Sequence, residues 1–104
     1  MKKFVLTETR RMNGGPLEKC ELSFIDKREA QSHMAGNLHM DLQYGNFEHM
    51  SIKHSEPIQD LQNMFYDDPK FKFDFDYLAL WSGEELEDSE HFCVYEITER
   101  MSNN

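Results

Sequence analysis

The stretch Phe71-Lys-Phe-Asp-Phe-Asp-Tyr-Leu-Ala-Leu-Trp81 carries the longest alternating pattern in this chain of 104 residues. Apolar or aromatic side chains occupy every second position from its first residue to its last, which is typical of a β-strand with one buried face. Residues His91–Thr98 predict a further strand, and Gly83 favours a turn between the two. We therefore expect Asp74–Trp81 and His91–Thr98 to form an antiparallel hairpin joined by the loop Ser82–Glu90.

Two strands and a helix are expected before this hairpin. Residues Lys3–Thr9 and Leu17–Ile25 are rich in strand-forming side chains and flank a loop of Asn, Gly and Pro. Asp26 is a suitable helix N-cap, and Glu29 three residues later completes a variant of the capping box. Apolar side chains then recur every fourth residue, at Ala30, Met34, Leu38 and Leu42. The sequence Tyr44-Gly45-Asn46 predicts the end of this helix.

A weaker strand and a second helix are expected between the first helix and the hairpin. Phe47–Lys53 is the strand candidate, and Ser55 can cap a short helix that ends before Pro69. The order of elements is then ββα(β)αββ. This order predicts an α+β fold, with an antiparallel sheet of four or five strands and two helices packed on one face.

The length and composition predict one domain over residues 1–104, with a frayed tail at 101–104. No apolar run approaches the roughly 20 residues of a membrane span, and the apolar run near the N-terminus is too short for a signal peptide. We therefore expect a cytoplasmic protein. Cys20 and Cys93 lie far apart in the sequence and are expected to be free thiols.

Negative charge is concentrated in the second part of the chain. Residues 1–35 hold seven basic and five acidic side chains, residues 36–104 hold four and fifteen, and the net charge is −9. Such a balance disfavours nucleic acid or an anionic membrane as a direct ligand, because both require Lys and Arg. It favours a basic protein as the partner, including one whose own ligand is nucleic acid.

The hairpin is the expected binding surface. With the aromatic side of Phe71–Trp81 against the helices, its outer side combines apolar residues with carboxylates, which is typical of a protein interface. The candidate partner-binding residues are Asp74, Asp76, Leu78, Leu80, Glu84, Glu85, Glu87, Asp88, Glu90 and Phe92. Two alternatives stay open: another segment can cover this side, and an acidic loop can serve solubility alone.

No residue pattern predicts catalysis, a cofactor or a metal site. His33 and His39 are six residues apart, which puts them on different sides of a helix. His91 and Cys93 share one face of a strand, but nothing positions the third group that an activated thiol needs. We therefore expect a protein that is not an enzyme.

Three segments carry a resemblance to known proteins: Lys2-Lys-Phe-Val-Leu-Thr-Glu, Asp76-Tyr-Leu-Ala-Leu-Trp-Ser-Gly and His91-Phe-Cys-Val-Tyr-Glu-Ile. They resemble small, mostly uncharacterised acidic proteins of phages and mobile elements of Gram-positive bacteria. Some proteins of that kind are anti-CRISPR or antirestriction inhibitors. The resemblance implies inhibition of host defence and brings no catalytic residues.

Charge and resemblance together predict a small inhibitor from a phage or mobile element. Its acidic hairpin is expected to occupy the basic surface of a host nuclease or other nucleic-acid-binding enzyme. The alternative is a homo-oligomeric structural or regulatory protein, such as a homodimer, with no inhibitor role.

Overall fold

The computed structural model describes residues 2–53 and 76–101. These residues form five strands, one α-helix and one short 3-10 helix. The elements are β1 (Lys2–Arg11), β2 (Glu18–Phe24), α1 (Lys27–Tyr44), β3 (His49–Lys53), β4 (Tyr77–Trp81), η1 (Leu86–Asp88) and β5 (Phe92–Met101).

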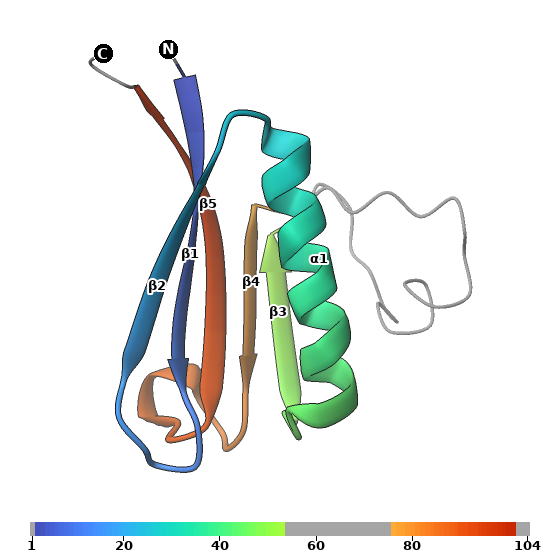
Figure 1. The fold of residues 1–104 in the computed structure, drawn as a ribbon. Helices are drawn as coiled ribbons and strands as arrows, with labels where there is room; N and C mark the ends of the chain where they lie inside the picture. The colour runs from blue at the N-terminus through green and yellow to red at the C-terminus, as the bar shows by residue number, and fades with distance from the viewer. Residues whose placement is uncertain (1, 54–75, 102–104) are drawn as a thin grey trace.

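The five strands make one antiparallel sheet in the order β2-β1-β5-β4-β3 (Figure 1). Strands β1 and β5 lie side by side in the middle and pair over ten residues, from Lys2 opposite Met101 to Arg11 opposite Phe92. Strands β2 and β3 form the two edges. Helix α1 connects these edges, and its axis runs roughly along the strands on one face of the sheet (Figure 1).

Local signals at both ends of α1 are confirmed. The Asp26 side chain accepts a hydrogen bond of 2.8 Å from the Arg28 N–H, as an N-cap should. At the other end the Gly45 N–H donates to the Asp41 carbonyl at 2.8 Å, and Asn46 turns the chain with a φ of 56°. A Cβ at Gly45 would overlap the ring of Phe47, so glycine is required for this ring to pack against the helix end.

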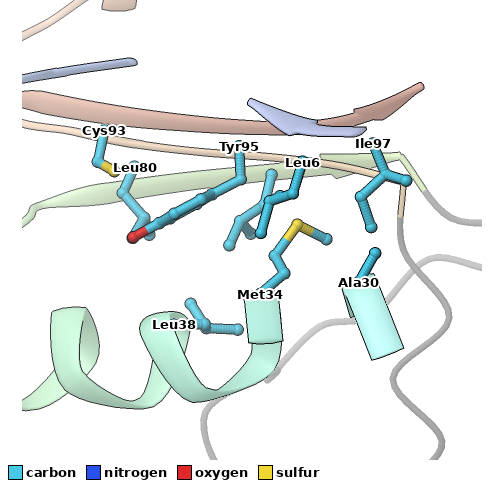
Figure 2. Packing of buried hydrophobic residues seen from close by; sticks show 9 residues of the cluster. Leu6, Ala30, Met34, Leu38, Leu80, Cys93, Tyr95 and Ile97 are labelled. Carbon is cyan, nitrogen blue, oxygen red and sulfur yellow. The ribbon is translucent and has the colours of Figure 1, made fainter. Parts of the chain in front are cut away.

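The core lies between α1 and the sheet (Figure 2). Its side chains come from α1 and from three neighbouring strands, and none is more than 7% exposed. The cluster consists of Leu6, Ala30, Met34, Leu38, Leu78, Leu80, Cys93, Tyr95 and Ile97. The apolar stripe of the helix therefore packs on the centre of the sheet, as its spacing predicts.

The expected arrangement of two helices on one face is wrong. The described residues form a five-stranded sheet covered by the single helix α1, so the α+β chain is mostly sheet. The apolar stripe of α1 supplies the whole helical side of the buried core cluster, with Ala30, Met34 and Leu38 packed against strands β1, β4 and β5. The second helix was expected within residues 55–68, which lie outside the described residues.

The weaker strand candidate is confirmed as β3, which pairs with β4. The strand expected over residues 71–81 is described only from Tyr77, because its first part lies outside the described residues. No helix in the described parts of the chain combines the length and the apolar character that a membrane crossing needs.

Candidate partner-binding surface

The connection between β4 and β5 presents a cluster of carboxylates. Five of its side chains are acidic and exposed, and residues 82–90 include no Lys or Arg. These exposed acids are Glu84, Glu85, Glu87, Asp88 and Glu90. Four of them line a hollow of about 470 Å³ together with Ser82, Gly83 and Ser89. The loop therefore offers a concave acidic surface, with its negative charge facing solvent.

Ser89 holds the two ends of this loop together. The side chain is buried, and its Oγ lies 2.7 Å from the Ser82 carbonyl, to which it donates. The same Oγ accepts a bond of 3.1 Å from the His91 N–H, while the Ser82 N–H donates to the His91 carbonyl at 3.0 Å. The backbone of the loop is thus closed by hydrogen bonds at its base.

The loop is also fastened to the segments beside it. The Gly14 N–H, in the turn between β1 and β2, donates to the Glu90 carbonyl at 2.7 Å. On the other side the Gly83 N–H donates to Oε1 of Glu48, just before β3, at 3.2 Å. The loop, the turn between β1 and β2, and the segment before β3 all lie at the same end of the sheet (Figure 1). A loop whose backbone is held on both sides keeps the positions from which its acidic side chains project, which lowers the entropic cost of binding.

His91, just before β5, contacts two further connections at this end of the sheet: the turn between β1 and β2, and the segment between α1 and β3. Its Nδ1 accepts a hydrogen bond of 3.2 Å from the Asn13 N–H, so the proton of the neutral ring is on Nε2. Nε2 therefore donates to the Gly45 carbonyl at 2.5 Å. The ring also stacks on Phe47, with centroids 4.7 Å apart. These contacts place His91 at the base of the loop, where it links the loop to the segments before β2 and before β3.

The outward orientation expected for Leu78 and Leu80 is wrong. Leu78 lies opposite Tyr95 and Leu80 lies opposite Cys93, and residues directly opposite in an antiparallel pair share a face. Both leucines therefore point toward α1 and are at most 1% exposed. Their side chains belong to the core, so neither residue is part of the candidate partner-binding surface.

The face of the hairpin away from α1 carries other apolar side chains. Phe92 lies there as expected, half-buried, and in the register it is opposite Trp81 of β4 and Arg11 of β1. Tyr77 and Val94 are also half-buried on this face. The apolar character of the expected surface is thus supplied by aromatic residues of β4 and β5 rather than by leucines.

The two remaining candidates are separate from the loop. Asp76 is exposed at the start of β4, where its carboxylate forms an ion pair of 3.1 Å with Lys27 at the beginning of α1. Asp74 lies outside the described residues. The structure therefore brings together the five loop acids, while Asp76 lies at the opposite end of β4.

A buried polar cluster was missed in the sequence analysis. Asp41 of α1 is 6% exposed and accepts hydrogen bonds from the Tyr95 hydroxyl at 2.5 Å and from Nη2 of Arg10 at 3.1 Å. Nη2 of Arg10 also contacts Glu8 at 2.8 Å. Asp41 follows Leu38 by three residues, so a carboxylate on the apolar side of the helix was the available signal. The cluster fixes the last turns of α1 to β1 and β5.

The chemistry of this cluster does not favour catalysis. Burial raises the pKa of the Cys93 thiol to about 12, and burial also raises the pKa of Tyr95 above its usual range. A thiol of that kind stays protonated at neutral pH and is a poor nucleophile. Cys93 thus acts as a small apolar core residue.

The stability of the protein is expected to fall with alkaline pH through Cys93. The unfolded thiol ionises above about pH 9, whereas the folded one stays protonated to about pH 12. Between these values the unfolded state binds fewer protons, so the free energy of unfolding falls by about 1.4 kcal/mol per pH unit. Urea unfolding from pH 8 to pH 11 measures this slope. Cys93→Ala should lower it by that amount, and an unchanged slope contradicts the prediction.

Within residues 2–53 and 76–101, no group of three or more His, Cys, Asp or Glu side chains is placed to hold a metal ion. Comparison of the chain with protein-family models, with curated proteins and with solved structures gave no match.

Proposed function

We propose that the protein is a non-enzymatic binding protein whose acidic loop, residues 82–90, docks on a basic surface of another protein. The observation that carries this proposal is the set of five exposed carboxylates on a loop whose backbone is hydrogen-bonded on both sides. Preorganised charge of one sign attracts the opposite charge from a distance and gives a specific complex at low entropic cost.

The favoured partner is a nuclease or another nucleic-acid-binding enzyme of a bacterial host. The surface of such an enzyme is lined with Lys and Arg that normally neutralise phosphates. Carboxylates on a loop with a fixed backbone can form ion pairs with those Lys and Arg side chains and thereby exclude the nucleic acid. The resemblance to small acidic proteins of phages and mobile elements supports an inhibitory outcome, and the site of action is then the cytoplasm.

The alternative of self-assembly through the outer side of the hairpin has less support. Leu78 and Leu80, two of its expected anchors, are buried against α1 within one chain. Phe92 alone of the three expected apolar candidates remains on the outer side, and it is half-buried.

A competition experiment tests the proposal. The protein is immobilised, a bacterial host lysate is passed over it at low salt, and bound proteins are eluted with nucleic acid. The supporting result is a nucleic-acid-binding enzyme that the nucleic acid displaces and whose activity the free protein inhibits. Retention of nothing, or of a protein that nucleic acid does not displace, overturns the decoy mechanism.

The matched variants are two triple charge reversals. The loop triple is Glu84→Lys/Glu85→Lys/Glu87→Lys, and the control triple is Glu29→Lys/Glu96→Lys/Glu99→Lys. Each triple contains three Glu→Lys reversals and therefore changes the net charge by the same amount, and all six side chains are exposed. Only the loop triple should abolish capture of the enzyme.

A further inference from the structure

Strand β2 is an exposed edge of the sheet. In the described part of the chain it pairs only with β1, and six of its seven residues are exposed. An edge strand presents backbone N–H and C=O groups that are free to pair with another strand. Leu17, just before the strand, and Leu22 within it are also exposed, at 55% and 39%. This edge therefore has both the backbone groups and the apolar contacts that strand addition needs.

The charges of this edge are complementary to themselves. Lys19 and Glu21 are exposed and lie on the same face of β2, on either side of Cys20. When a second copy pairs antiparallel with Cys20 opposite Cys20, each Lys19 lies opposite a Glu21 of the other copy. If the two-fold axis passed through residue 19 instead, Lys19 would lie opposite Lys19. If it passed through residue 21, Glu21 would lie opposite Glu21. Opposite charges stabilise directly facing positions and like charges destabilise them, so one register is favoured.

We infer that two copies of the protein associate through β2, with the two-fold axis at Cys20, to form a continuous ten-stranded sheet. Residues of the same parity face each other in this register, so both α1 helices lie on the same side. The edge belongs to the part of the chain in which basic residues outnumber acidic ones, seven to five, so it avoids most of the net charge of −9. This interface is separate from the acidic loop and does not depend on the proposed function.

Cysteine cross-linking tests the register. Residues opposite each other in an antiparallel pair have Cα atoms about 4.5 to 5.5 Å apart, which is within disulfide range. Mild oxidation of the full chain should therefore give a Cys20-linked dimer on a non-reducing gel, and Cys20→Ser should give none. Cys93 is buried and does not compete.

Displaced cysteines distinguish this register from random collision. In the Cys20→Ser background, position 18 of one copy lies opposite position 22 of the other. Glu18→Cys and Leu22→Cys should each fail to cross-link alone and should cross-link when the two proteins are mixed. Equal cross-linking of each variant with itself overturns the register.

A charge exchange tests the association without oxidation. Lys19→Glu and Glu21→Lys each create two repulsive pairs by symmetry, so each should raise the dimer dissociation constant about tenfold or more. The double variant Lys19→Glu/Glu21→Lys restores both attractive pairs and should return to the wild-type value. Sedimentation equilibrium measures all four proteins, and thermal unfolding checks that each is folded. A wild type that stays monomeric at about 1 mM, or a double variant as weak as the singles, overturns the inference.

Discussion

Reversal of Glu84, Glu85 and Glu87 to lysine is expected to weaken binding of the captured enzyme about 100-fold. Each carboxylate lies at the surface, where one favourable charge pair contributes up to about 1 kcal/mol. With a mid-range value of about 0.5 kcal/mol per pair, replacing each attraction by an equal repulsion at three positions amounts to about 3 kcal/mol. Each 1.4 kcal/mol is a tenfold change in the dissociation constant. Titration calorimetry of the wild type and the loop triple against the enzyme measures the difference.

The salt dependence and the control triple show whether position or net charge is responsible. Affinity of the wild type should fall steeply between 50 and 300 mM salt, and affinity of the loop triple should change little. The reversals at Glu29, Glu96 and Glu99 leave the loop intact and should cost about threefold or less, as expected for distant, screened charges. If both triples lose the same affinity, the field of the whole protein binds the enzyme and the loop has no special role.

Replacement of Arg10 by methionine is expected to lower the free energy of unfolding by about 3 kcal/mol. The carboxylate of Asp41 is 6% exposed, and without the guanidinium its charge is buried with only the Tyr95 hydroxyl as a donor. Removal of one partner of a buried ion pair costs about 3–5 kcal/mol, and the partial exposure of Arg10 favours the lower end. Urea unfolding at pH 7 measures the change.

A second variant separates the lost charge pair from lost packing. Asp41→Asn retains a hydrogen-bond acceptor for Tyr95 and removes the charge, so Arg10→Met/Asp41→Asn should recover much of the loss. A double variant as unstable as the single one would show that packing of the Arg10 side chain is what matters. A loss below about 1 kcal/mol in Arg10→Met would show that the pair contributes little to stability.

Local sequence signals were sufficient to predict the position and the buried face of helix α1. The N-cap at Asp26, the apolar stripe of α1 and the turn at Gly45 act over a few residues, and the structure has each of them. The orientation of β4 could not be obtained in this way. All five of its residues, Tyr77–Trp81, are apolar or aromatic, so alternation fits either face. The pairing of Leu78 with Tyr95 decides the orientation, and that contact is between distant residues.

The candidate surface shows the same division between local and distant effects. The acids of the loop between β4 and β5 are exposed where the sequence placed them, because a run of charge bounded by two strands has no apolar face to bury. The supports of this loop come from Gly14, Glu48 and His91, which no local pattern connects. The Arg10–Asp41–Tyr95 cluster likewise joins three elements and is visible only in the assembled fold.

The position of β5 has a consequence for the order of folding. β1 is made first and β5 last among the described elements, yet these two strands form the longest pairing in the sheet. Contacts between such distant residues are slow to form, because a large loop has to close before they contribute. During synthesis, β1 is covered only on its β2 side until residues 92–101 have been added. Between the synthesis of β2 and that of β5, the nascent chain therefore carries an open strand edge at β1, next to the centre of the sheet.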